Sequence, residues 1–129
     1  MNVVVALEGV HKRFGGTRAL DGAGITLYAG EVHALVGENG AGKSTLIKTM
    51  TGIYQADDGE IRIDGEPVQL SSSADAQNRG IVAIYQEPMI FPDLSVAENI
   101  FIGHRRRGQL VRWRKMYDQA GEILRSLDI

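Results

Sequence analysis

The chain has 129 residues, of which 43% are hydrophobic and 23% charged, a composition typical of a globular domain with a core. Sixteen Asp and Glu residues against fourteen Lys and Arg give a net charge of −2, which argues against bulk attraction to nucleic acid. The sequence has no cysteine, which excludes disulfides, thiolate metal sites and thiol catalysis.

The first thirty residues predict antiparallel sheet. Val3, Val5 and Leu7 fall at alternate positions, Gly15-Gly16 supplies a turn, and a second apolar series leads to Ala29-Gly30. The apolar run behind Met1 is too short for a signal peptide or a membrane span, and no basic region precedes it. We therefore expect any membrane association to come through a partner.

A strand, a loop and a helix are predicted next. The apolar residues of 32–36 indicate a short strand, and Leu46, Ile47 and Met50 have helical spacing, with Gly52 as a natural end to the helix. Between them, residues 37–45 satisfy the phosphate-binding pattern Gly-x-x-x-x-Gly-Lys-[Ser/Thr]. In such a loop, backbone N–H groups surround an anion at the start of a helix.

The loop therefore predicts a nucleoside triphosphate site with Mg²⁺. Lys43 would reach the β- and γ-phosphates, and the Ser44 hydroxyl would bind Mg²⁺. Asn39 could approach the γ-phosphate, or it could serve a turn that needs tolerant backbone angles. The expected phosphate-binding residues are Gly37, Glu38, Asn39, Gly40, Ala41, Gly42, Lys43, Ser44 and Thr45.

The remainder of the chain predicts a hairpin, a buried strand and three helices. Asp64-Gly65 is a two-residue hairpin turn, and residues 81–85 form a continuous apolar run typical of a strand buried on both faces. Helices are expected over 72–80 and from Ser95, both with capping-box spacing, and from about Val111, where apolar residues fall on one face.

Three segments together resemble the nucleotide-binding domain of ATP-binding cassette (ABC) transporters. Their sequence is most similar to the carbohydrate importers of the ribose, galactose and xylose type. The three segments are Gly37–Thr45, Ile84–Pro88 and Leu94–Ile100, in this order. The resemblance implies an incomplete α/β domain of an ABC ATPase. Residues 1–94 would contain the N-terminal antiparallel β-subdomain and the P-loop core, and residues 95–129 the start of a helical subdomain.

Two further site residues follow from the resemblance alone. Phe14 matches the aromatic residue that stacks on adenine, although an aromatic residue in a hairpin is more often part of a core. Gln86 matches the glutamine that helps to bind Mg²⁺ and orients the attacking water, as a catalytic residue beside Lys43; the alternative is a solvated loop residue. For the basic run 105–115, the alternatives are a solvated face and contact with acidic permease loops or lipid headgroups.

Several family motifs do not occur in this sequence. They are the Leu-Ser-Gly-Gly-Gln signature, the strand ending in Asp-Glu and the switch histidine. We therefore expect the chain to be the N-terminal part of a larger ATPase and to be inactive alone. In the family, strands from later sequence separate 32–36 from 81–85, so these segments should pair differently, be bridged by a second copy, or stay unpaired, and self-association is expected.

The leading hypothesis is the ATP-binding subunit of a sugar importer at the cytoplasmic face of the cell membrane. Its expected partners are ATP, a transmembrane permease, a second nucleotide-binding domain and, indirectly, a sugar-binding protein, with no nucleic acid. The alternative is an ABC-type regulatory or repair module that is not attached to a transporter.

Overall fold

The computed structural model describes residues 2–85, 89–103 and 110–129. The chain divides into two compact units, Met1–Ile84 and Tyr85–Ile129, and each is described by itself. Within the described residues, no helix is both long and apolar enough to cross a membrane.

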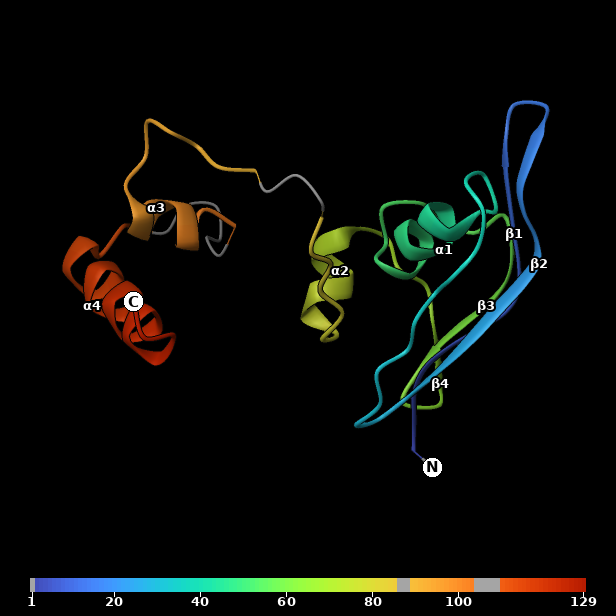
Figure 1. Ribbon diagram of the computed structural model, residues 1–129, viewed down its shortest axis with the longest axis horizontal. Coiled ribbons are helices and arrows are strands. Elements are labelled where there is room, and N and C mark those ends of the chain that lie inside the picture. The colour runs from blue at the N-terminus through green and yellow to red at the C-terminus, as the bar shows by residue number, and fades with distance from the viewer. Residues whose placement is uncertain (1, 86–88, 104–109) are drawn as a thin grey trace. The chain divides into compact units, whose positions relative to one another are not determined.

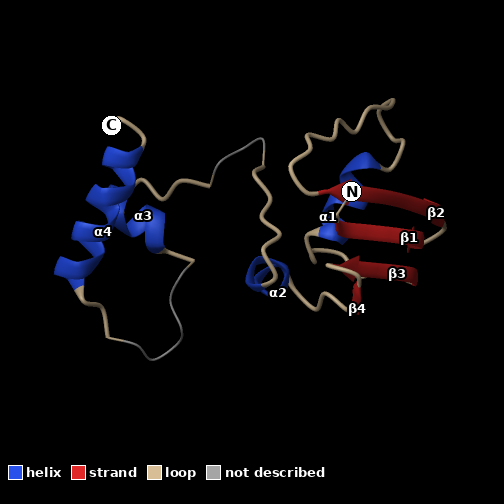
Figure 2. Ribbon diagram, turned by 90° about the horizontal axis from the view of Figure 1, so that it is seen from below, coloured by secondary structure: helices blue, strands red, loops and turns tan. Residues whose placement is uncertain are grey.

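The first unit contains a four-stranded antiparallel sheet in the order β2-β1-β3-β4 (Figures 1 and 2). Its strands are β1 (Val3–Phe14), β2 (Thr17–Tyr28), β3 (Asp58–Ile63) and β4 (Glu66–Val68). The two predicted hairpins are confirmed. Asp64 and Gly65 both have positive φ, 50° and 84°, as a type I′ turn between β3 and β4 requires.

Two helices belong to this unit, α1 (Lys43–Met50) and α2 (Ser73–Asn78). Helix α1 lies against one face of the sheet (Figures 1 and 2), and Leu46 carries it into the core. The Ser72 side chain accepts a hydrogen bond from the Asp75 N–H and so caps α2, as its spacing predicts. The core consists of buried side chains from the strands, α1, α2 and the segment between β4 and α2: Val5, Leu7, Val10, Leu20, Leu46, Ile61, Leu70 and Ala76.

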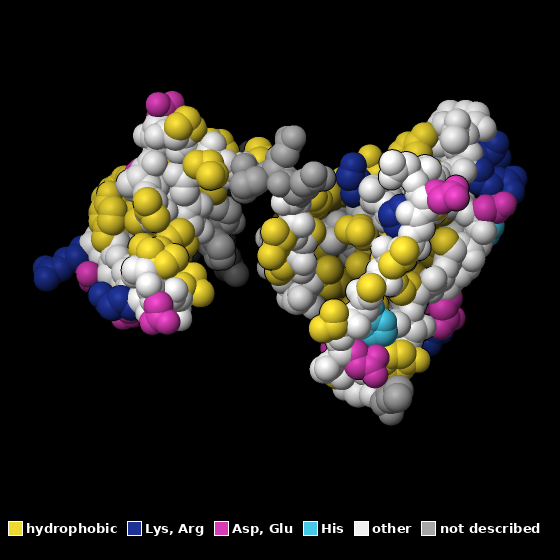
Figure 3. Space-filling view, in the orientation of Figure 1, with side chains coloured by type: hydrophobic (Ala, Val, Ile, Leu, Met, Phe, Trp, Pro, Cys, Tyr) yellow, Lys and Arg dark blue, Asp and Glu magenta, His cyan; other side chains and the backbone are white. Residues whose placement is uncertain are grey.

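The strands predicted over 32–36 and 81–85 do not form. Neither segment belongs to the sheet of the described residues, and apolar side chains that should be buried are exposed: Val32 and Val36 by 101% and 88%, Val82 and Ile84 by 69% and 98%. Ile81, by contrast, is partly buried and packs against the core. The physical reason is that a strand needs a hydrogen-bonding neighbour, and β2 and β4 end the sheet without reaching either segment. Apolar side chains are visible on the surface of both units (Figure 3).

The second unit contains α3 (Val96–Phe101) and α4 (Trp113–Ser126). The predicted capping box is present at the start of α3, where the Ser95 side chain accepts from the Glu98 N–H and the Glu98 carboxylate accepts from the Ser95 N–H. On α4, Ala120 is buried, whereas Trp113 and Tyr117 stack with ring centroids 6.4 Å apart and remain half exposed. The amphipathic helix expected from about Val111 is thus confirmed with a start two residues later.

Candidate functional site

The phosphate-binding pattern forms an exposed loop that runs directly into α1 (Figure 1). Its one internal backbone hydrogen bond outside the helix joins the Ala41 N–H to the Glu38 carbonyl, at 3.2 Å. The Leu46 N–H donates to the Gly42 carbonyl at 2.8 Å, which begins the helical ladder. The loop and the start of the helix therefore lie where the sequence predicts them, while the residues before the loop lack the expected strand.

Gly42 is the residue where α1 meets the sheet. Its φ is 85°, and a Cβ at this position would lie 2.7 Å from the Ala19 carbonyl oxygen of β2. Both the backbone angle and the close approach exclude larger residues without local rearrangement. Glycine is therefore needed here both for the backbone angle and for packing against β2.

The start of α1 presents free hydrogen-bond donors. The first N–H groups of any helix lack an intrahelical acceptor, and here, among the described residues, no side chain caps the N-cap residue Gly42. These donors and the positive end of the helix dipole favour an anion. Ser44 is exposed beside them, and Thr45 is half buried.

Lys43 folds back onto the loop. Its Nζ donates to the carbonyl oxygens of Gly37 and Glu38, at 2.5 Å and 2.7 Å, and the side chain is half buried. The ammonium group is thus held against the loop that leads into α1. The arrangement could accept a polyanion if the two carbonyl contacts were exchanged for phosphate oxygens.

The donor set suits Mg²⁺ only in company with phosphate. The Ser44 hydroxyl is a suitable hard oxygen ligand, and among the described residues no group of three or more His, Asp or Glu side chains could hold a metal ion. Mg²⁺ is commonly held by one or two protein oxygens together with substrate phosphates, which matches a lone hydroxyl beside a phosphate loop. Gln86, the second predicted Mg²⁺ ligand, lies outside the described residues.

Phe14 lies at the end of β1 and is 43% exposed. Its ring contacts Tyr54 edge to face, with centroids 4.9 Å apart and planes at 66°, so it is neither a buried core residue nor a free surface ring. Sequence reasoning missed Tyr54, because nothing in the local pattern pairs two residues that lie forty positions apart.

An ion pair lies beside this aromatic contact. Lys12 Nζ is 2.8 Å from Asp57 Oδ1, and the Arg13 N–H donates to Asp57 Oδ2 at 2.7 Å. The hydrogen bond from the Lys12 side chain, followed by that from the Arg13 backbone, lowers the pKa of the Asp57 carboxyl below its ordinary value. The end of β1 is thus held to the segment that follows α1.

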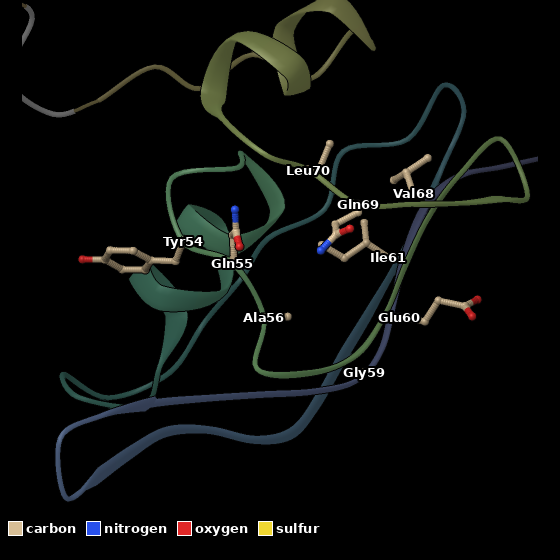
Figure 4. A pocket seen from close by; sticks show the side chains of 9 residues that line it. All are labelled: Tyr54, Gln55, Ala56, Gly59, Glu60, Ile61, Val68, Gln69 and Leu70. Carbon is tan, nitrogen blue, oxygen red and sulfur yellow. The ribbon is translucent and has the colours of Figure 1, made fainter.

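A cavity of about 240 Å³ lies elsewhere in this unit, between β3, β4 and the segment after α1 (Figure 4). The ring of Tyr54 extends away from the side chains of Ile61 and Gln69 (Figure 4). The volume is below the range usual for small-molecule sites, and no residue of the phosphate loop lines the cavity, so we assign it no ligand. Its lining residues are Tyr54, Gln55, Ala56, Gly59, Glu60, Ile61, Val68, Gln69 and Leu70.

Comparison with known protein families shows to which family the chain with this loop belongs. The family model described as "ABC transporter" matches residues 20–129. The chain belongs to the ABC transporter family. The match includes the whole loop 37–45, the first unit from residue 20 onward and all of the second unit, which confirms the family resemblance of the sequence.

Individual relatives of this ABC family member are sugar-import proteins. A ribose import ATP-binding protein of Jannaschia sp. (strain CCS1) is 54% identical over 127 residues, 97% of this chain and 25% of the relative. A fructose import ATP-binding protein of Bifidobacterium longum (strain NCC 2705) is 46% identical over 129 residues, 99% of this chain and 25% of the relative. The chain thus spans about a quarter of the length of these relatives.

Solved ABC structures share the fold. A nucleotide-free ATP-binding cassette from an ABC transporter superposes with a TM-score of 0.81 at 31% identity, over 98% of this chain and 54% of that one. The ADP conformation of such a cassette gives a TM-score of 0.73 at 34% identity, over 84% of this chain and 43% of that one. The predicted fold class, part of an ABC ATPase with an N-terminal antiparallel sheet, is confirmed.

Proposed function

We propose that this chain provides the nucleotide-binding loop of an ATP-binding subunit in a sugar importer, where ATP binding and hydrolysis are coupled to uptake. The observation that carries the proposal is the uncapped start of α1 behind an exposed glycine-rich loop, with the Lys43 ammonium folded over it. The family match and the sugar-import names of its relatives support the choice of substrate class.

Each residue of the loop has a role in this proposal. The backbone of Gly37 to Gly42 wraps the phosphates, and the N–H groups of Lys43, Ser44 and Thr45 meet their oxygens at the positive end of α1. Lys43 exchanges its bonds to the loop carbonyls for bonds to the β- and γ-phosphates. Mg²⁺, when bound with the nucleotide through Ser44 and Gln86, would neutralise phosphate charge.

Phe14 and Gln86 complete the proposed site. The half-exposed Phe14 ring offers a surface on which adenine stacks. Gln86 orients the attacking water, a role that we retain as a proposal from the family resemblance. Lys43 and Gln86 are thus the proposed catalytic residues.

The proposed partners are a transmembrane permease, a second nucleotide-binding domain and, indirectly, a sugar-binding protein, which would place the subunit at the cytoplasmic face of the membrane. The sugar-import relatives do not favour the alternative of a regulatory or repair module. Co-purification from cells separates the two hypotheses. Recovery of a polytopic permease supports the importer, whereas recovery of nucleic acid supports the repair module.

The test of the nucleotide site is titration of the chain with a fluorescent ATP analogue. Lys43→Ala should weaken binding by about ten- to a hundredfold, because a charge-assisted phosphate contact contributes about 1.5–3 kcal/mol. Lys115→Ala removes an exposed lysine of α4 in the other unit and is the matched control. Equal affinity of the wild type and Lys43→Ala would contradict the proposal.

A further inference from the structure

Tyr54 is the residue that contacts the exposed ring at the end of β1. Its ring lies edge to face with Phe14 at a centroid distance of 4.9 Å. Such a contact restricts the rotation of both rings and contributes beyond the area that it buries. Tyr54 lies outside the phosphate-binding pattern, and the roles proposed above leave it without one.

The segment 53–57, which carries Tyr54, is fastened to the C-terminal end of α1. The N–H groups of Ile53 and Tyr54 both donate to the Lys48 carbonyl, at 2.9 Å and 3.1 Å. The Lys48 ammonium lies over the Tyr54 ring, 5.4 Å from its centroid. Tyr54 therefore has a defined position relative to the helix whose other end begins at the phosphate loop.

The same segment is fastened to β1 through Asp57. The Asp57 N–H donates to the His11 carbonyl at 2.9 Å, and its carboxylate accepts from Lys12 Nζ and from the Arg13 N–H. These three contacts fix the strand residues directly before Phe14. Lys12 Nζ also lies over the Phe14 ring, 5.6 Å from its centroid.

Segment 53–57 is thus a short bridge between α1 and the end of β1. Helix α1 has eight residues, so it spans about 12 Å from the phosphate loop to this bridge. An aromatic side chain at the end of a hairpin has several rotamers, and a base can stack on the ring only in those that turn a ring face toward the bound nucleotide. The bridge holds the ring at a set distance and orientation from the loop.

We propose that Tyr54 is a positioning residue for nucleobase binding, which holds the Phe14 ring ready to stack on the base of a nucleotide whose phosphates occupy loop 37–45. This inference rests on the proposed function. It adds that Tyr54, through Phe14, makes the site bind a nucleotide more tightly than a polyphosphate without a base. Tyr54 acts through Phe14 and not by touching the phosphates.

The test compares the dissociation constants of ATP and inorganic tripolyphosphate for the 129-residue chain, by calorimetry. Tripolyphosphate has the phosphates without the nucleoside, so the ratio of the two constants measures the contribution of base and ribose together, and its change in a Tyr54 variant measures what Tyr54 adds to it. Tyr54→Leu should raise the constant for ATP by about three- to tenfold and leave that for tripolyphosphate unchanged within about twofold. Tyr54→Phe keeps the ring and should restore the wild-type ratio.

Two controls separate positioning from general support of the fold. Tyr117→Leu removes a half-exposed ring of the other unit and should change neither constant. If Tyr54→Leu fails to fold by circular dichroism, Tyr54→Met, which fills similar volume without a ring, takes its place. A variant without the ring that weakens both ligands equally, or neither, overturns the inference.

The wild type separates failure of this inference from failure of the proposed function. Binding of neither ligand would refute the nucleotide site itself. Equal affinity for ATP and tripolyphosphate would leave the phosphate loop intact and refute base stacking, and with it the role of Tyr54. Tighter binding of ATP that Tyr54→Leu abolishes and Tyr54→Phe restores supports the inference.

Discussion

The β1–β2 hairpin and the segments 32–36 and 81–85 are all rich in apolar residues. In the hairpin several of these side chains are buried in the core, whereas in the two segments most of them are exposed. Val10 of β1 is completely buried, whereas Val36 and Ile84 are 88% and 98% exposed. The strands of a hairpin pair across a turn of a few residues, so their hydrogen bonds form within one stretch of chain. The two segments have no such neighbour, and apolar character alone did not make them strands.

The largest contrast should come from the same substitution in the two regions. Val10→Ala removes buried methyl groups and should lower the free energy of unfolding by about 2–3 kcal/mol, whereas Val36→Ala should change it by less than about 0.5 kcal/mol. Chemical denaturation followed by circular dichroism measures both. Trp113 lies in the other unit, so the unfolding transition followed by its fluorescence should be the same in the wild type and in both variants. Equal costs would mean that Val36 is covered in solution.

Two glycines of the phosphate loop differ in the same way, because one lies against the sheet and the other does not. Gly40 and Gly42 both have positive φ, 87° and 85°, but only a Cβ on Gly42 would meet the β2 backbone. Gly42→Ala should therefore cost about 1–3 kcal/mol more than Gly40→Ala, which changes only the backbone preference. Thermal unfolding of the two variants measures the difference. Equal destabilisation would show that α1 does not press on β2.

Acid should loosen the bridge between β1 and the segment after α1. The folded-state pKa of Asp57 is lowered, first by the Lys12 side chain and then by the Arg13 N–H, so its stabilising effect is complete above the unfolded value near 3.8. The effect is lost as the pH falls through the folded value. Asp57→Asn should make unfolding of the first unit less sensitive to acid as the pH falls below about 3.8. A pH profile of Asp57→Asn that equals that of the wild type contradicts this expectation.

A substitution in the exposed segments should have the smallest effect on stability, but it should measurably reduce self-association. The uncovered apolar side chains of 32–36 and 81–85 favour self-association, and Val36→Lys should reduce it while changing the unfolding free energy by less than about 0.5 kcal/mol. Light scattering over a range of micromolar concentrations measures the outcome. A wild-type chain that stays monomeric at every concentration contradicts this expectation.

The sequence by itself determined the elements that depend on a few neighbouring residues. The phosphate-binding pattern and the start of α1, the Asp64-Gly65 turn and the Ser95 and Glu98 capping box were all predictable, because their hydrogen bonds close within one turn of chain. The roles of the loop residues and of Gln86 remain predictions.

Only the tertiary structure decided which apolar segments became strands and where Phe14 lies. Strand formation requires a neighbour that supplies hydrogen bonds along its whole length, and segments 32–36 and 81–85 have none in the described sheet. The contact of Phe14 with Tyr54 depends on Asp57 joining two parts of the chain that are more than forty residues apart. Long-range contacts of this kind leave no periodicity in the sequence, so no local pattern could have predicted them.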